Sequence, residues 1–330
     1  MTVTKSFTPG LHLLCIAALL AALALMVAPS PMGQAAAANG QGPWVIVVLN
    51  SGGTDAQGHD IPGALYTVDS ATGTLYGPFL QGQLGSAGGG LFDVAITPGC
   101  GIALVSNFVD STVYLVDFSD PTNLRLIGSV NLGFFAEDIA ITADGKFALV
   151  ADGGFSARLA SINMATGTLV EVQDLGGRYA NAVAVAPDGT VIVVDYFGKK
   201  VHTLTVDSSG NLTLAQSYDL PMVIEHGEEI HLRPVNVAVA PDGRTVLVLA
   251  TNSDHVPVYR ITGPGTLEYM GLVEGLPAVW REDNRAWSGS QQSVAFNCKG
   301  TQAYVLTNGI FSSPNQLESS SKISVLEDRS

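Results

Sequence analysis

A phrase that recurs along the chain limits the folds open to it. "NAVAVAPDGTVIVVD" runs from Asn181 to Asp195, and "VNVAVAPDGRTVLVLATN", from Val235 to Asn252, repeats most of it. Spacings of 45, 44, 54 and 57 residues separate the five copies, whose cores begin at Asp93, Asp138, Ala182, Asn236 and Ser293. A period of this length is typical of propellers and solenoids, in which each repeat forms one structural unit.

Every copy continues with the same series of strand and turn signals. An apolar strand leads through a Pro-Asp-Gly-like turn into a second apolar strand, such as "VIVVD" or "AYVLTN". A third strand such as "TVYLVDF" follows, and a Gly or Asn turn joins it to a fourth, such as "GTLVEVQDL". Asp-Gly and Ser-Gly-Asn signals between β-branched runs are typical of hairpins. Four antiparallel strands per repeat, without helical periodicity between them, predict an all-β β-propeller.

The second strands are apolar at nearly every position, which predicts that neighbouring blades cover both of their faces. We expect one propeller domain over residues 39–330, with six blades. They cover approximately residues 43–92, 93–137, 138–181, 182–235, 236–292 and 293–330. The first blade lacks its innermost strand and the last lacks its outermost. Because an unpaired sheet edge is an aggregation hazard, we expect that this chain is incomplete at its C-terminus and lacks the strand that would close the ring. Closure through another chain and an open seam are the alternatives.

The first 38 residues have the pattern of a secretory signal peptide. Lys5 precedes an apolar run from Leu11 to Val27, in which His12 is the one polar residue, and the small residues Ala36 and Ala38 suit cleavage. The alternative is an uncleaved membrane anchor, because the run approaches the ~17–25 residues that span a bilayer. We expect cleavage, and therefore a secreted, periplasmic or cell-envelope protein that keeps no membrane span.

The chain is acidic, with 15 Lys and Arg against 29 Asp and Glu and a net charge of −14. Such a surface repels phosphate backbones, so nucleic acid is not an expected partner. Two cysteines, Cys100 and Cys298, lie outside the predicted signal peptide. Both fall in the first turn of a blade, in the second and sixth units. We expect free thiols, because these turns should lie beyond the ~7 Å between Cα atoms that a disulfide tolerates.

Two second strands carry a motif of their own. "AYVLTN" at Ala303–Asn308 and "VLVLATN" at Val246–Asn252 resemble the repeat of the YVTN-family β-propellers. "HTLTVDSSGNLTLAQSYDL" and "LYTVDSATGTLYGPF" are similar to strands of the neighbouring lactonase-like propellers. The resemblance covers nearly the whole mature chain and implies a seven-bladed ring, one blade more than the repeats show. It also implies an exported prokaryotic protein, with a lactone-hydrolysing branch among its relatives.

Asn or Asp ends the second strand of every unit, at Asn50, Asn107, Asp152, Asp195, Asn252 and Asn308. A short amide or carboxylate can accept a hydrogen bond from the backbone two residues on, which would hold the turn into the third strand. Asp144, Asp188 and Asp242 belong to Asp-Gly turns and are predicted to form those turns. The repeated phrase is therefore mainly scaffold.

Function is expected where the repeats differ. Long loops join second to third strands, "NSGGTDAQGHDIPG" and "NGIFSSPNQLESSSK", or connect blades, "LPMVIEHGEEIHLRPVN" and "GLPAVWREDNRAWSGSQQS". Both classes leave an antiparallel four-stranded blade at the same end, which we predict to be the binding face.

Residues that lead into the innermost strands should surround the mouth of the central channel on this face. They are Glu137, Asp138, Asn181, Asn236 and Gln292. An oxygen-rich ring of this kind can bind Ca²⁺. Gluconolactonase-like propellers, which the chain resembles, hold a metal in such a place. A solvated polar lining is the alternative.

One blade connection combines imidazole and carboxylate groups, in Glu225, His226, Glu228, Glu229, His231 and Arg233. These groups suit Zn²⁺ or Mn²⁺, although their spacing matches no standard site. A second hypothesis places Glu137, His231 and Arg233 together as catalytic residues that polarise a lactone carbonyl and activate water. Solvated loop side chains are the alternative to both hypotheses.

Aromatic and Arg side chains in other blade connections could anchor a protein or a sugar. They are Tyr179, Trp280, Arg281 and Trp287. The alternative is that they pack beneath their own loops. His202 and His255 fall beside third strands, where we expect structural or solvent-facing side chains.

The sequence contains no nucleophile elbow, HExxH, P-loop or dinucleotide-binding motif. We therefore predict a propeller that binds a small-molecule ligand or a protein through its long-loop face. A lactonase-type hydrolase, with or without a divalent metal, is the main alternative, and a structural surface module is the second.

Overall fold

The computed structural model describes residues 44–49, 63–85, 90–99, 101–225, 227–251, 253–276, 279–281, 286–288, 290–297, 300–310 and 320–327. These residues form strands and turns, and the described part of the chain contains no helix. Consequently no described segment is a helix long and apolar enough to cross a membrane. The predicted signal peptide, Cys100 and Cys298 lie outside the described residues.

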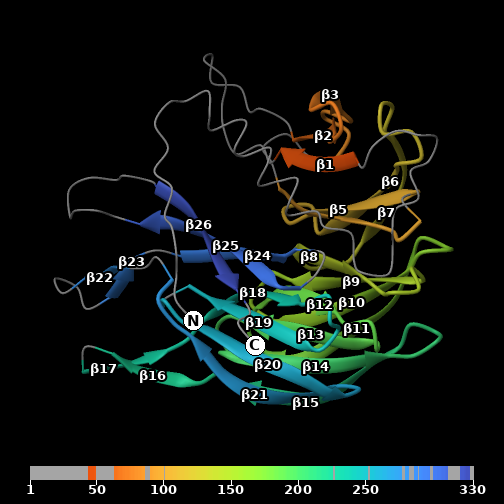
Figure 1. Ribbon diagram of the computed structural model, residues 1–330. Coiled ribbons are helices and arrows are strands. Elements are labelled where there is room, and N and C mark those ends of the chain that lie inside the picture. Colours follow the sequence, from red (N-terminus) through yellow and green to blue (C-terminus); the bar gives the residue numbers. More distant parts are fainter. Residues whose placement is uncertain are drawn as a thin grey trace.

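Four sheets have four antiparallel strands in chain order (Figure 1). They are β4 (Leu91–Ile96), β5 (Ile102–Asn107), β6 (Thr112–Asp117) and β7 (Arg125–Asn131); β8 (Ala136–Ile141), β9 (Phe147–Asp152), β10 (Ala157–Asn163) and β11 (Thr168–Gly177); β12 (Ala180–Val185), β13 (Thr190–Asp195), β14 (Lys200–Val206) and β15 (Leu212–Asp219); and β18 (Pro234–Val239), β19 (Thr245–Ala250), β20 (Val256–Gly263) and β21 (Thr266–Val273).

Two further sheets have three strands each. The first comprises β1 (Trp44–Leu49), β2 (Ala64–Asp69) and β3 (Thr74–Phe79), and the last comprises β24 (Ser290–Phe296), β25 (Gln302–Ile310) and β26 (Ser320–Glu327). The innermost strands β4, β8, β12, β18 and β24 contact one another in succession. The sheets therefore follow one another around a common axis, which confirms the all-β propeller.

The predicted blade number is wrong. In the described residues, five sheets begin with an innermost strand that carries the repeated phrase, and the sheet β1–β3 has no such strand. It packs against the first blade through β1 and β4. The described chain thus has five blades, rather than the six counted from the sequence or the seven implied by the resemblance. Strand signals alone counted β1–β3 as a blade, but a sheet without an innermost strand supplies nothing at the axis.

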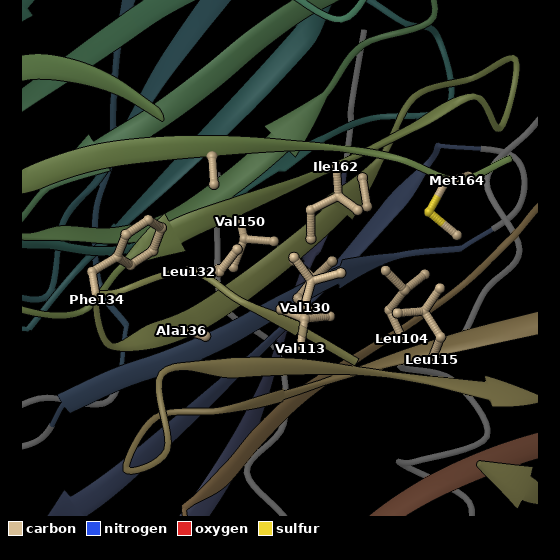
Figure 2. Close-up of a cluster of buried hydrophobic side chains, with 13 residues drawn as sticks. Leu104, Val113, Leu115, Val130, Leu132, Phe134, Ala136, Val150, Ile162 and Met164 are labelled. Carbon is tan, nitrogen blue, oxygen red and sulfur yellow. The ribbon is translucent and has the colours of Figure 1, made fainter. Parts of the chain in front are cut away.

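The hydrophobic core lies between neighbouring blades. Every residue of β9 and of β13 is buried, as expected for central strands covered on both faces. One cluster joins β4–β7 to β8–β11 through side chains such as Leu104, Val113, Val150 and Ile162 (Figure 2). Each sheet is too thin to bury its apolar faces alone, so the blades stabilise one another in series.

Two of the predicted loops are hairpins instead. β16 (Met222–Glu225) pairs with β17 (Glu228–His231), and β22 (Val279–Arg281) pairs with β23 (Ala286–Ser288). Both hairpins project from the same side of the molecule, at the left of Figure 1. The first has a buried face in which Val223 and Ile230 pack with Leu232.

Candidate functional site

The strand register gathers the variable segments at one end of each blade. In the blade β12–β15, Ala180 lies opposite Asp195, Asp195 lies opposite Lys200, and Lys200 lies opposite Asp219. The segment before the first strand, the turn after the second and the end of the fourth are therefore neighbours. This confirms, for the described loops, that blade connections and second-to-third-strand turns share one face.

A β-bulge interrupts the innermost strand of each of the five blades near this face. The bulge falls on Glu137 and Asp138 in β8 and on Asn181 in β12. A bulge re-aims the side chains that it carries, and bulges are common beside functional sites. These three residues were candidates from the sequence, and the bulges determine the directions of their side chains.

The side chain of Glu137 is buried, although the sequence predicted this residue at the mouth of the central channel. Its exposed fraction is 2%, and its Oε2 atom has no hydrogen-bond partner among the described residues. The Tyr179 hydroxyl forms a hydrogen bond with the Glu137 carboxyl group. A methyl group placed on Gly153 would overlap Glu137 Oε2 and lie 2.7 Å from the Phe108 ring. The carboxyl group is therefore held among two aromatic residues and the bare backbone of a glycine.

Gly153 occupies a position that carries an aromatic ring in adjacent blades. The N–H groups of Phe108, Gly153 and Tyr196 each donate to a backbone oxygen just before an innermost strand, which marks them as equivalent. The acceptors for Gly153 and Tyr196 are Phe135 and Tyr179. The glycine at this position of the blade β8–β11 leaves the space that the Glu137 carboxyl group fills.

Burial raises the pKa of Glu137 to about 8, a hydrogen bond from Tyr179 opposes that rise, and the negative charge of Asp152 adds to it. Asp152 is itself fully buried and is held by Arg158 Nε at 2.6 Å and by the Gly154 N–H at 2.8 Å. Burial raises the pKa of Tyr179, and the Glu137 carboxyl group raises it further. At neutral pH the carboxyl group of Glu137 is therefore mostly protonated.

Two aromatic clusters belong to this site, one with Phe108 and one with Tyr179. Phe108 and Phe135 stack with centroids 4.6 Å apart, and Phe135 keeps 40% of its surface exposed. Tyr179 contacts Tyr196 at 6.1 Å and Phe197 at 5.7 Å in edge-to-face arrangements. The site thus combines one buried acid with partly exposed aromatic surface, as ligand sites commonly do.

Arg233 joins the same group of residues. Its guanidinium lies 5.8 Å from the centroid of the Tyr196 ring, and Tyr196 contacts Tyr179, which binds Glu137. Two of the three residues in the catalytic hypothesis are therefore linked through aromatic contacts. The third, His231, is exposed on β17 of the projecting hairpin.

The other ring residues hold neighbouring blades together. Asp93 Oδ2 accepts the Ile139 N–H at 2.9 Å, and Asp138 Oδ2 accepts the Val183 N–H at 2.7 Å. Burial raises the pKa of both Asp93 and Asp138, and their mutual charge raises that of Asp138 further. These carboxyl groups already serve backbone donors.

Asn181 continues this series, since its Nδ2 donates to the Val235 carbonyl oxygen at 2.8 Å. Asn236 is half-buried in β18. Gln292 lies in β24, and its side chain is outside the description.

The predicted metal ligands of the blade connection lie along the hairpin β16–β17. Glu229 and His231 are exposed on one face of β17, whereas Glu228 lies on the other. His226 and the side chain of Glu225 are outside the description. Within the described residues, no group of three or more His, Cys, Asp or Glu side chains is arranged to hold a metal ion.

The predicted aromatic anchors fall in two places. Tyr179 belongs to the Glu137 site. Trp280 and Arg281 lie in β22, and Trp287 lies in β23, where it is paired with Trp280 in the backbone register. Nothing is described of these three side chains.

The predicted turn residues behave as scaffold. Asp152 accepts the N–H of Gly154, two residues on, and Asp195 accepts that of Gly198, three residues on. Asp195 also accepts the N–H groups of Arg178 and Tyr179, so it fixes the backbone that carries the Tyr179 ring. Asp144, Asp188 and Asp242 accept backbone N–H groups within their turns, as predicted.

The two histidines beside third strands are buried and structural. His202 Nδ1 lies 2.8 Å from Ser217 Oγ, and His255 Nδ1 lies 2.9 Å from Ser253 Oγ. His202 Nε2 is 3.7 Å from Asp195 Oδ2, which is beyond hydrogen-bond distance. These side chains fill the interior of their blades and do not line the long-loop face.

Sequence reasoning missed Phe108, Phe135 and Gly153. A signal was available, because Phe108 and Tyr196 each follow the Asn or Asp that ends a second strand, while Asp152 is followed by Gly153. Gly153 stands where neighbouring blades have an aromatic residue, and Glu137 lies on the adjoining strand β8. This combination marks the site.

Comparison with known proteins identifies the fold alone. No family model matches the sequence, and no curated protein matches it significantly. Among solved structures, the periplasmic gluconolactonase of Pseudomonas aeruginosa has a TM-score of 0.57 at 16% identity, over 84% of this chain and 83% of that one. A candidate 6-phosphogluconolactonase from Bacteroides uniformis has a TM-score of 0.57 at 14% identity, over 84% and 81%.

Hydrazine synthase of Kuenenia stuttgartiensis is similar as well, with a TM-score of 0.56 at 17% identity over 75% of this chain and 70% of that one. Proteins whose names describe unrelated activities thus match to the same degree. Since one fold supports many functions, function has to be argued from the site.

Proposed function

We propose that this protein binds a small molecule at the long-loop face, at a site made by Glu137, Tyr179, Phe108, Phe135 and Arg233. The observation that carries the proposal is the buried Oε2 atom of Glu137, which has no hydrogen-bond partner among the described residues. A buried polar atom without a partner costs roughly 1–3 kcal/mol, so native proteins keep few of them without a reason. A ligand or ordered water that reaches this atom would supply the missing bond.

The surroundings suit a small organic molecule. Phe135 and Phe197 are 40% and 44% exposed, which leaves apolar surface beside the acid. Phe108, Tyr179 and Tyr196 are partly buried around it. Aromatic surface with a few polar groups is the usual composition of a ligand site. The acidic chain does not favour nucleic acid, and export through a signal peptide over residues 1–38 is part of the same proposal.

The proposal is tested by the melting temperature of the purified chain in the presence of small neutral sugars, lactones and lactams. A ligand that binds only the folded state raises the melting temperature. Glu137→Ala should abolish the increase, whereas the matched variant Glu268→Ala, on the outermost strand β21, should retain it. An increase that survives in Glu137→Ala would place binding elsewhere.

Lactone hydrolysis is the second candidate function. It is favoured by the similarity to solved structures named as a gluconolactonase and a candidate 6-phosphogluconolactonase, and by a carboxyl group whose pKa of about 8 lies near neutral pH. A group with such a pKa can give or take a proton at neutral pH. Tyr179 and Arg233 would then orient the lactone.

Titration of the acid released from D-glucono-1,5-lactone tests this candidate, after correction for spontaneous hydrolysis. Loss of the catalysed rate in Glu137→Gln, with binding retained, is the expected result. Addition of Ca²⁺ or Zn²⁺ and of a chelator tests metal dependence. Absence of any catalysed rate would reject the hydrolase and leave the binding proposal in place.

A further inference from the structure

We propose that Glu137 contacts its ligand as a neutral carboxylic acid that donates a hydrogen bond, so that the ligand is an uncharged compound with an accepting oxygen, such as a lactone, lactam or cyclic ether. The inference rests on the proposed function, because it concerns the chemistry of the same site. It excludes a metal ion or organic cation bound through Glu137.

The contacts of the carboxyl group favour the protonated form. An ionised carboxylate only accepts hydrogen bonds and needs several donors when it is buried. Glu137 has one side-chain donor, the Tyr179 hydroxyl, and its Oε2 atom has no partner among the described residues. Phe108 and the backbone of Gly153 lie against that atom and offer it no donor that the structure describes. A proton on the carboxyl group removes the uncompensated charge and creates a donor for a ligand.

The charged groups around Glu137 act in the same direction. Asp152, at the end of β9, is negative, and the Arg158 guanidinium from β10 is committed to Asp152. On the innermost strands, Asp138 and Asp93 form a hydrogen-bonded pair, and Asp138 and Glu137 repel each other when both are ionised. Tyr179, from the segment before β12, is the remaining titratable contact. Of the two cations at the site, Arg158 pairs with Asp152, and the Arg233 guanidinium lies against the Tyr196 ring.

The proton makes recognition depend on pH. Burial raises the pKa of Glu137 to about 8, so the donor is present at neutral pH and is lost as the pH rises above that value. Affinity for an oxygen acceptor should then fall by about tenfold for each pH unit above 8. A cation would show the opposite dependence, since ionised Glu137 would attract it.

The test uses δ-valerolactam, which carries an accepting carbonyl oxygen, does not titrate and is stable over this range. Its dissociation constant is measured by NMR between pH 6.5 and 9.5 for the wild type, Glu137→Gln and the matched control Glu268→Gln. Wild type and control should lose affinity above pH 8. Glu137→Gln should bind equally at every pH, because the amide donates without ionising.

Tyr179→Phe supplies an independent variant should Glu137→Gln fold poorly. The Tyr179 hydroxyl lowers the pKa of Glu137, so its removal should move the loss of affinity to higher pH. A residue with only a packing role would not move this midpoint.

Three outcomes overturn the inference. Affinity that does not change with pH in the wild type would reject the neutral donor while leaving the binding proposal intact. Affinity that increases above pH 8 would point to the ionised form. Absence of lactam binding at any pH would reject the ligand class, and the melting-temperature survey with other molecules would then decide whether the site binds at all.

Discussion

At the scale of single residues, the candidate site depends on the fit between Gly153 and Glu137. The carboxyl group lies where a side chain on Gly153 would stand, and the equivalent positions of two neighbouring blades carry Phe108 and Tyr196. The acid is therefore buried because of a residue on another strand, and its own sequence context, "AEDIAI", gives no indication of this.

Gly153→Ala should disturb this fit. The added methyl group overlaps Glu137 Oε2 and crowds the Phe108 ring, so we expect a loss of about 1–3 kcal/mol in the free energy of unfolding. Gly128→Ala is the matched control, because a methyl group there meets no atom within 4 Å. Urea unfolding of both variants measures the difference. Equal stabilities would show that Glu137 is not packed against Gly153.

Glu137→Gln should change how stability depends on pH. Folding moves the pKa of Glu137 from an ordinary value of 4.5 to about 8, so between these values the folded chain holds a proton that the unfolded chain has released. Wild-type stability therefore falls as the pH rises through this window. Because glutamine does not ionise, the variant should be more stable than the wild type at pH 8, by on the order of 1–3 kcal/mol, with little difference below pH 5.

Urea unfolding at pH 5 and pH 8 checks this expectation, with Glu268→Gln as the control for loss of one negative charge. The stability of each variant is compared with that of the wild type at the same pH, because Asp93 and Asp138 contribute to the pH dependence of all three proteins. A stability difference that stays constant between the two pH values would mean that Glu137 ionises normally.

At the scale of elements, the innermost strands are held together by carboxyl groups that reach from one blade to the next. Asp138 accepts the Val183 N–H of the following blade. Asp138→Ala should leave that N–H without its partner and lower the free energy of unfolding by roughly 1–3 kcal/mol. Asp138→Asn keeps an accepting oxygen and removes the repulsion with Asp93, so its effect should be smaller or stabilising at pH 7. Thermal unfolding of the pair separates the two contributions, and equal losses in both variants would contradict the assignment.

The strands themselves were the most predictable part of the molecule. Continuous apolar runs and Asp-Gly turns predicted central strands such as β9 and β13, because burial on both faces leaves a clear pattern. The hairpin β16–β17 was missed, since four-residue strands with mixed polar and apolar side chains carry too little pattern to differ from a loop. The blade count was wrong for another reason. The sequence of β1–β3 has the pattern of a second, third and fourth strand, but a blade also needs an innermost strand at the axis.

At the scale of the whole molecule, the sequence predicted which segments share a face better than it predicted the contacts between their side chains. Antiparallel geometry alone puts the variable segments on one face, and Glu137, Tyr179 and Arg233 were candidates for that reason. Their association could not be predicted, because it runs through Phe108, Gly153 and Tyr196, which three separate blades bring together. Contacts between distant parts of a repeat protein depend on small irregularities, such as bulges, that the repeat pattern conceals.

The most direct test of the account is a map of backbone amide chemical shifts during titration of the wild-type chain with δ-valerolactam at pH 7. We predict saturable changes centred on Glu137, Gly153 and Tyr179, with the outer strands β7, β11 and β21 unaffected. Saturable changes that centre on the hairpin β16–β17 and leave these three residues unaffected would contradict the claim that this protein binds small molecules through the Glu137 site.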